Sequence, residues 1–332
     1  MMTAKPDSFV YQLKEAKRFI EVRDDFLVVS HVQPDGDAVS STAAVGLMLK
    51  RLGKTFTMLN NDRIPAKFDF LAGAGDIVCV ADGGVPKRAF RNVIAVDCAD
   101  FSRIGDAAGW FAPDAEILNI DHHPTNDNYG AVTLIRSDAA ATAEILADLA
   151  DALGIVWDKA LADCIYSGLL TDTGGFRYAN TTPQVMHLAA RMLQYGTEPH
   201  LLAERLLERT PYTHIQLLKR ALATLSFTKG NRISWIQVTT RDIAETGASS
   251  EDMEGLVNYP RNIEGVEVGV LFKEVEPRKI KVSFRSGGNV DVASLAKRLG
   301  GGGHLRAAGC TLEMTLEAAV EHVIELVKRE LP

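Results

Sequence analysis

The chain has 332 residues, of which 46% are hydrophobic, and it carries a formal net charge of −7. This length predicts about two domains, and the apolar content is enough for folded cores, which excludes a disordered chain. The acidic balance argues against a long nucleic-acid duplex as a partner, because duplex binding uses many Lys and Arg contacts to phosphates. A short nucleotide ligand remains compatible with this charge.

The sequence carries neither a signal-peptide pattern nor an apolar run of the ~20 residues that a membrane helix needs. Its four cysteines, Cys79, Cys98, Cys164 and Cys310, are scattered and form no CxxC pair. They predict reduced and buried thiols, so we expect a cytoplasmic protein that does not enter a membrane. A role near a metal stays open for Cys98, because it follows Asp97 directly.

Helical patterns and short apolar runs alternate along the first half of the chain. Residues 8–22 and 38–51 carry apolar side chains at helical spacing and predict two helices. Short apolar runs predict strands at 26–30, 56–59, 77–80, 93–96 and 117–120. This alternation indicates βαβ units and a mostly parallel sheet, and the continuously apolar strands indicate a sheet covered on both faces.

The second half changes character. Residues 183–225 are helical in pattern and predict a linker between two domains. Further strands are predicted at 233–238, 266–272 and 280–284, and further helices at 292–299 and 316–331. The expected fold class is therefore α/β, with a catalytic domain at 1–195, a helical linker at 196–226 and a smaller α/β domain at 227–332.

Carboxylates and imidazoles follow several of the predicted strands. Because the carboxyl ends of parallel strands meet at one edge of a sheet, we expect these side chains to converge there. Without cations, so many carboxylates would repel one another strongly. The residues that follow strands are His31, Asp35, Asp37, Asp97, Asp121, His122 and His123. Asp172 joins them from the end of a helical pattern that starts near Leu161.

Hard divalent cations favour carboxylates, and Mn²⁺ also accepts imidazole. A turn after His31 lets this residue and Asp35 bind one ion while Asp37 reaches a second ion. Asp97 suits a carboxylate that bridges the two ions. The competing interpretation is that an Asp after a strand only forms a turn or caps a helix, and this stays open for Asp37, which precedes a helix.

This ordered set of motifs resembles the DHH phosphoesterase superfamily. The matching residues are His31-x-x-Pro34-Asp35-x-Asp37, the isolated Asp97, Asp121-His122-His123 and Asp172, and the run 300–303 followed by His304 resembles a DHHA1 domain. The resemblance covers nearly the whole chain. It is greatest to the bacterial branch that hydrolyses short RNAs and 3′-phosphoadenosine 5′-phosphate.

The resemblance implies two divalent cations, with Mn²⁺ expected first and Mg²⁺ or Co²⁺ as alternatives. It assigns His31, Asp35 and Asp97 to one ion, and it assigns Asp37, Asp97, His122 and Asp172 to the other. Two such ions lower the pKa of a shared water, which attacks phosphorus. His123 is expected to stabilise or protonate the leaving oxygen, and Asp121 to orient a histidine of the triplet.

The glycine run predicts a loop that something approaches closely, or else a flexible connector. Backbone N–H groups of Gly302 and Gly303 and the side chains of His304 and Arg306 could bind a phosphate there. The resemblance implies that Arg285 and His304 hold the nucleotide beyond the scissile bond. Arg103, six residues after Asp97, is either a surface charge or a further ligand contact.

Several functions fit these motifs. The preferred one is hydrolysis of RNAs of a few nucleotides, including dinucleotides, and of 3′-phosphoadenosine 5′-phosphate, and a homodimer is compatible with the resemblance. A cyclic or linear dinucleotide phosphodiesterase uses the same parts. A pyrophosphatase or exopolyphosphatase is less favoured because of the DHHA1-like domain, and a RecJ-like exonuclease because it carries additional domains. A non-catalytic nucleic-acid-binding module is the alternative from another class.

Overall fold

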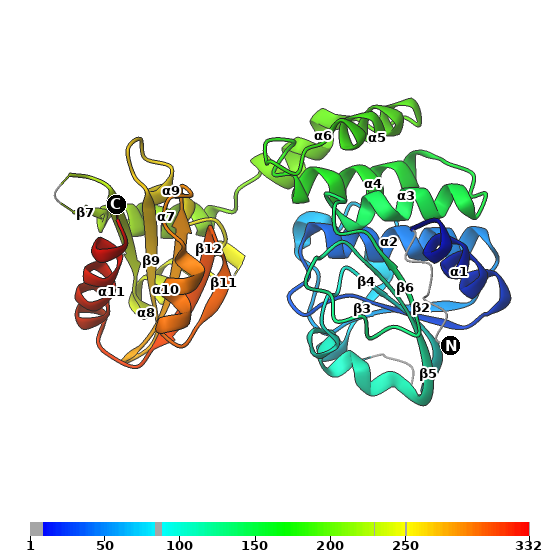
Figure 1. Cartoon of the computed structure of the whole chain (residues 1–332), viewed down its shortest axis with the longest axis horizontal. Coiled ribbons are helices and arrows are strands. Elements are labelled where there is room, and N and C mark those ends of the chain that lie inside the picture. The colour runs from blue at the N-terminus through cyan, green and yellow to red at the C-terminus, as the bar shows by residue number, and fades with distance from the viewer. Residues whose placement is uncertain (1–8, 84–87, 229, 250, 332) are drawn as a thin grey trace, which may run out of the picture. The chain divides into compact units, whose positions relative to one another are not determined.

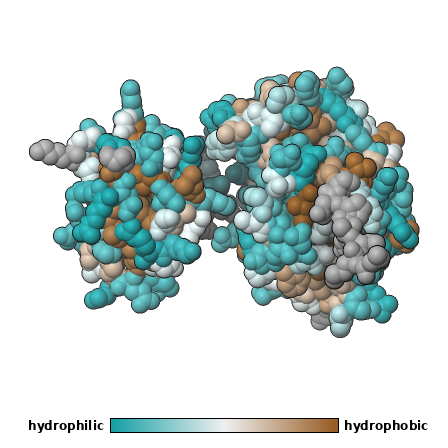
Figure 2. All heavy atoms as spheres, viewed as in Figure 1, coloured by the Kyte–Doolittle hydropathy of each residue, from teal (hydrophilic) through white to brown (hydrophobic). Residues whose placement is uncertain are grey.

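The structure is a computed structural model that describes residues 9–83, 88–228, 230–249 and 251–331. It divides into two compact units, and the division falls between Arg209 and Thr210 (Figure 1). This point lies inside the region 196–226, which the sequence predicts as a linker. Hydrophilic residues cover most of the visible face of each unit (Figure 2). Among the described helices, none combines the length and the apolar character needed to span a bilayer.

The first unit is built on a parallel sheet of six strands, in the order β3-β2-β1-β4-β5-β6. The strands are β1 (Phe26–Val29), β2 (Phe56–Asn60), β3 (Ile77–Cys79), β4 (Phe90–Val96), β5 (Phe111–Asp121) and β6 (Val132–Ile135). All four residues of β1 are completely buried, as expected for a strand covered on both faces. The predicted α/β class is therefore confirmed, although the sequence missed β6 and the first half of β5.

Helices form layers above one face of this sheet (Figure 1). The sequence anticipated α1 (Phe9–Val22) and α2 (Gly36–Arg51), and these pack on the sheet together with α3 (Thr142–Ala152). Next come α4 (Lys159–Asp172), which packs on α2 and α3, and then α5 (Pro183–Gln194) and α6 (Pro199–Ala203), with one π-helical turn at Glu204–Glu208. The opposite face is covered by the 3₁₀ segment η4 (Phe101–Trp110) rather than by an α-helix. Short 3₁₀ turns at Ala66–Phe68, Ala74–Asp76 and Val80–Asp82 complete this unit.

The second unit has a mixed sheet in the order β11-β12-β10-β9-β8-β7. Its strands are β7 (Ser226–Phe227), β8 (Ile233–Val238), β9 (Val268–Glu276), β10 (Lys279–Ser286), β11 (Gly302–His304) and β12 (Ala307–Leu312). One face packs on α10 (Val292–Arg298) and α11 (Leu316–Glu330). On the other face, α7 (Tyr212–Ala223), a 3₁₀ turn (Glu251–Met253), α8 (Thr240–Thr246) and α9 (Asn258–Arg261) lie over β8 and β9.

The glycine run corrects one expectation, because part of it is a strand and not a loop. Gly302 to His304 form β11, which pairs with β12 in an antiparallel hairpin. A Cβ atom at Gly301 would lie 2.1 Å from the Gly309 carbonyl oxygen, and one at Gly303 would lie 2.5 Å from the Ala307 carbonyl oxygen. Two of the glycines are therefore required by the close approach of the chain's own backbone.

Candidate metal centre

Three neighbouring strands of the first unit end at the same edge and carry the predicted donors. His31 comes just after β1, Asp97 follows β4, and Asp121 closes β5. In one group the Nε2 atom of His31 lies 3.8 Å from Asp35 Oδ1 and 3.6 Å from Asp97 Oδ2. Each of these three residues has a donor atom within 4.8 Å of the other two, a separation that one cation can span.

A second group of donors lies beside the first. It contains Asp37 from α2, His122 from the loop after β5, and Asp172 from the last turn of α4. His122 Nε2 lies 3.4 Å from Asp172 Oδ2 and 3.6 Å from Asp97 Oδ1. Asp97 thus faces both groups, through Oδ2 toward His31 and through Oδ1 toward His122.

Asp97 is held in this central position by its backbone. It is 2% exposed, and its φ of 53° is in the left-handed region, which non-glycine residues rarely adopt. Its N–H donates to the Ile120 carbonyl oxygen at 2.9 Å, and its Oδ1 accepts from the Thr142 hydroxyl at 3.1 Å. Strain at a residue that also carries a converging carboxylate is typical of functional sites.

The capping of α2 removes the competing interpretation of Asp37 as a helix cap. Asp35, and not Asp37, is the N-cap, because its Oδ1 accepts from the N–H groups of Asp37 and Ala38. Asp37 lies inside the first turn and is completely buried. Its carboxylate accepts from the backbone N–H groups of Thr142 at 2.5 Å and Ala143 at 3.1 Å, at the start of α3. The positive end of the α3 dipole therefore stabilises this charge.

Two glycines make room for the buried donors, and sequence reasoning missed both. A Cβ atom at Gly168 on α4 would lie 2.5 Å from Asp37 Oδ1. One at Gly36 would lie 2.4 Å from the Thr171 side chain, on the turn of α4 that precedes Asp172. Both glycines have helical backbone conformations, so nothing local marks them. Only the packing of α2 against α4 shows why neither position has room for a Cβ atom.

The charges of the site are not balanced by the protein alone. Burial raises the pKa of Asp37 well above its usual value, and the carboxylates of Asp97 and Asp35 raise it further. Burial together with Asp37 and Asp97 raises the pKa of Asp172 in the same way. Mutual repulsion of buried carboxylates is relieved by a bound cation. Oxygen and imidazole donors in two groups around one shared carboxylate fit two divalent cations.

His31 has the orientation that a metal-binding histidine needs. Its Nδ1 lies 2.8 Å from the Val32 carbonyl oxygen, so a proton on Nδ1 leaves the Nε2 lone pair facing the carboxylates. Burial favours the neutral ring, but hydrogen bonds with Asp35 and Asp97 raise the pKa of His31 to about 10. Arg103, predicted either as a surface charge or as a ligand contact, lies with its Nη2 3.1 Å from His31 Nδ1.

His123 belongs with His122 and Asp97 to a third group of possible metal donors, in which its Nδ1 lies 3.7 Å from Asp97 Oδ1. Its Nδ1 lies 2.7 Å from Oδ1 of Asp121, which is completely buried. The Asn126 amide donates to the other oxygen of Asp121 at 2.6 Å and to Asn119 Oδ1 at 2.8 Å. With Nδ1 engaged by the carboxylate, Nε2 is the atom of His123 that remains for a ligand. Hydrogen bonding to Asp121 raises the pKa of His123.

Two predicted ligand residues of the second unit share one face of its sheet. Arg285 on β10 pairs with Ala307 of β12, and His304 on β11 pairs with the same Ala307 from the other side. Paired residues of adjacent strands point to the same face, so Arg285 and His304 flank Ala307 on that face. Gly302, Gly303, His304 and Arg306 are exposed, while Arg285 is partly buried.

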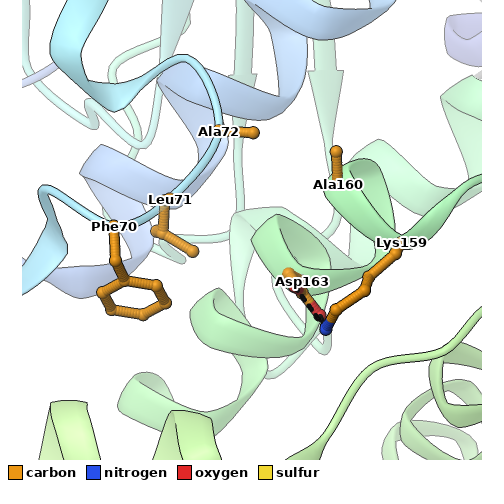
Figure 3. A pocket seen from close by; sticks show the side chains of 6 residues that line it. All are labelled: Phe70, Leu71, Ala72, Lys159, Ala160 and Asp163. Atoms are coloured by element: carbon orange, nitrogen blue, oxygen red, sulfur yellow. Dashed lines mark hydrogen bonds and ion pairs between the residues drawn. The ribbon is translucent and has the colours of Figure 1, made fainter.

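A pocket in the first unit is separate from these donors (Figure 3). It is lined by Phe70, Leu71, Ala72, Lys159, Ala160 and Asp163, and Lys159 forms an ion pair with Asp163 at 3.0 Å. Lys159, Ala160 and Asp163 lie in the first turns of α4, whereas Asp172 lies in its last turn. None of the predicted site residues lines this pocket.

Comparison with known proteins agrees with this fold. Residues 25–169 match the model of the DHH family N-terminal domain, and residues 235–331 match that of the DHHA1 domain. A Thermus thermophilus protein named bifunctional oligoribonuclease and PAP phosphatase NrnA is 35% identical over 93% of this chain and 91% of its own length. The Bacillus subtilis protein of the same name is 27% identical over 90% and 92%.

Solved structures share the architecture. An exopolyphosphatase-related protein from Bacteroides fragilis covers 98% of both chains with a TM-score of 0.88 at 24% identity. RecJ from Thermus thermophilus, solved with Mg²⁺, has a TM-score of 0.51 and matches over 97% of this chain but only 53% of its own. At these identities the similarity concerns the fold.

These family matches and relatives identify a phosphoesterase, and its donor groups form a candidate site for divalent metals. The chain belongs to the DHH family of phosphoesterases and carries a DHHA1 domain as its second unit.

Proposed function

We propose that this phosphoesterase hydrolyses short single-stranded oligoribonucleotides and 3′-phosphoadenosine 5′-phosphate with two bound Mn²⁺ ions. The observation that carries the proposal is a pair of neighbouring donor groups with Asp97 facing both. One group contains His31, Asp35 and Asp97, and the other contains Asp37, His122 and Asp172. The relatives named oligoribonuclease and PAP phosphatase, which match along nearly the whole chain, support the choice of substrates. A net charge of −7 favours short single strands over a duplex.

The residues of the first unit would hold the metals as follows. His31, Asp35 and Asp97 bind one cation, and Asp37, Asp97, His122 and Asp172 bind the other. When bound, the two cations supply a water of lowered pKa as the nucleophile and positive charge opposite the phosphoryl oxygens.

His123 acts on the substrate. We assign its Nε2 to the leaving oxygen, which it stabilises and protonates, because a raised pKa keeps a proton available on this ring. Asp121 fixes the ring through Nδ1 and is itself held by Asn126. Both the phosphodiester of an RNA and the 3′-phosphomonoester of 3′-phosphoadenosine 5′-phosphate have a leaving oxygen that this arrangement can serve.

The second unit contributes binding groups for the nucleotide. We assign this role to Arg285 and His304, supported by their position on one sheet face, with Arg306 and the N–H groups of Gly302 and Gly303 as further phosphate contacts. Arg103 beside His31 is assigned to a phosphate contact in the first unit. The four cysteines are free and buried, which supports function in the reducing cytoplasm. A homodimer is part of the same proposal.

One panel of substrates tests the function. Purified protein with Mn²⁺, Mg²⁺ or Co²⁺ is incubated with a diribonucleotide, 3′-phosphoadenosine 5′-phosphate, a cyclic dinucleotide, pyrophosphate and a duplex RNA. We expect turnover of the first two, fastest with Mn²⁺, and none in the Asp97→Asn variant. Turnover restricted to the cyclic dinucleotide or to pyrophosphate would refute the proposal. Light scattering of the same sample measures whether the chain is dimeric.

A further inference from the structure

The sheet of the second unit has an open, positively charged part that lies beyond Arg285. β10 alternates between buried apolar residues, which face α10 and α11, and residues of the opposite face, namely Lys281, Ser283 and Arg285. Across the sheet these three pair with Thr311, Gly309 and Ala307 of β12. Lys281 and Thr311 are exposed, and Ser283 and Gly309 are small. The helices of this face pack on the residues Ile236, Val238 and Leu271 of β8 and β9 instead.

A second lysine lies directly opposite Lys281. The register pairs Lys281 of β10 with Lys273 of β9, so two ammonium groups share this face at neighbouring positions. Like charges directly opposite each other destabilise a sheet. Burial lowers the pKa of Lys273, and the charge of Lys281 lowers it further. Within the described residues, neither lysine has an ion pair, although the chain has an excess of acidic residues.

A nearby lysine shows what the ordinary arrangement is. Lys279, two residues before Lys281 on β10, lies 3.4 Å from the carboxylate of Glu276, its partner across the hairpin. The Lys273–Lys281 pair thus differs from its surroundings in having two positive charges and no anion. An anionic ligand would remove this repulsion.

We propose that Lys273 and Lys281 form a second phosphate-binding site, which holds the distal part of a single-stranded RNA longer than a dinucleotide. The site extends the proposed function, because the RNA is the same substrate that Arg285 and His304 bind. Lys281 and Arg285 are four residues apart on one strand, so their Cα atoms are about 13 Å apart. This distance equals the rise of about four stacked nucleotides at roughly 3.4 Å each. A dinucleotide held at Arg285 ends before Lys281, whereas a pentanucleotide reaches it.

Binding without turnover gives the first test. Fluorescence anisotropy in the presence of a chelator measures the affinity for a labelled pentanucleotide and a labelled dinucleotide. We expect Lys281→Gln to weaken pentanucleotide binding about five- to tenfold and to reduce the salt dependence of log K by about 0.7, the value for one phosphate contact on a single strand. Dinucleotide affinity stays within about twofold of the wild type. Lys279→Gln, on the same strand but ion-paired, is the matched control and leaves both affinities unchanged.

Charge reversal separates binding from folding. Lys281→Glu places a carboxylate opposite Lys273, which replaces repulsion by attraction, so the thermal midpoint of unfolding stays equal or rises. We expect pentanucleotide binding to weaken further than in Lys281→Gln. The proposal is wrong if Lys281→Glu binds the pentanucleotide as the wild type does, or if it weakens the dinucleotide equally. If the wild-type protein does not hydrolyse a dinucleotide, the proposed function itself is wrong. Dinucleotide hydrolysis is measured separately from pentanucleotide binding, so the two failures can be distinguished.

Discussion

At the scale of single residues, the site depends on side chains whose orientation is set by their neighbours. Asp121 is completely buried and contacts His123 and Asn126, although it belongs to neither donor group. Burial opposes its charge, but hydrogen bonds with His123 and Asn126 lower the pKa of Asp121. An ionised Asp121 therefore fixes a proton on Nδ1 of His123 and leaves Nε2 for a ligand.

Replacing Asp121 by Asn removes this charge while keeping the size of the side chain. We expect kcat for a diribonucleotide to fall about 10- to 100-fold, as for other residues that orient a group at a metal site. The Mn²⁺ content, measured by atomic absorption, and the KM stay close to the wild-type values. Asp127→Asn makes the same change on an exposed residue of the same loop and keeps full activity. Loss of Mn²⁺ from Asp121→Asn would show that Asp121 supports the metals and not His123.

At the scale of elements, the contact between α2 and α4 carries two of the donors, Asp37 and Asp172. Gly168 is the point where the two helices leave space for the Asp37 carboxylate. In the second unit, the loop after β10 is organised by Glu267, which is 8% exposed. Its carboxylate accepts from Ser286, from the Gly288 N–H and from both the backbone and the side chain of Asn289.

Gly168→Ala tests the packing of α2 against α4. The added methyl group lies too close to Asp37, and we expect it to cost about 1–3 kcal/mol of stability through overpacking. Mn²⁺ affinity also falls, because Asp37 has to move. Thermal unfolding and calorimetric titration measure the two effects. Gly75→Ala is the matched control, because a Cβ atom there meets nothing within 4 Å. An unchanged Gly168→Ala variant would contradict the close approach.

Glu267 makes the stability of the loop after β10 depend on pH. Burial opposes the charge, but the hydrogen bonds from Asn289, Ser286 and Gly288 lower the pKa of Glu267 below 4.5. Because the pKa of Glu267 is lower in the folded state, ionised Glu267 stabilises the fold above pH 4.5. This stabilisation is lost as the pH falls through the folded-state pKa. We expect hydrogen exchange of residues 286–289 to accelerate below pH 4.5 after correction for intrinsic rates. In Glu267→Gln the corrected rate is already faster at neutral pH and changes little with acid.

At the scale of the whole molecule, the chain consists of two units with separate cores. All the proposed metal ligands belong to the first unit, where Asp37 and Asp172 carry unbalanced charge. A cation that binds the folded site stabilises the unit that contains it. None of the proposed ligands belongs to the second unit.

Metal removal should therefore act on one unit only. Hydrogen exchange measured with Mn²⁺ and with a chelator is expected to show Mn²⁺ protection at the starts of α2 and α3 and in the loop after β5. Exchange in residues 210–331 stays the same under both conditions. Equal protection of both units would contradict the assignment of the ligands to the first unit. His31→Ala, which lacks one donor, serves as the control. We expect Mn²⁺ to protect its first unit from exchange less than it protects the wild type.

Prediction from the sequence succeeded where local pattern decides and failed where distant contacts decide. Apolar runs located β1, β4 and the end of β5, and residue chemistry identified the donors that the structure brings together. The Asp37–Thr142 hydrogen bond joins residues 105 positions apart, so no local pattern could reveal that this carboxylate accepts from the N-terminus of α3. The glycine run predicts a loop because glycine is too flexible to favour a strand, and only its pairing with β12 makes Gly302–His304 a strand.

The left-handed backbone at Asp97 limits the thermal stability of this protein. Glycine adopts such a conformation without steric cost, whereas a residue with a Cβ atom loses about 1–3 kcal/mol. Asp97→Gly should consequently melt at a higher temperature than Asp97→Ala in a chelator, as calorimetry can determine, while both are inert. Thermal stability and the proposed metal binding thus compete at a single position, where the carboxylate side chain comes at the expense of a less strained backbone.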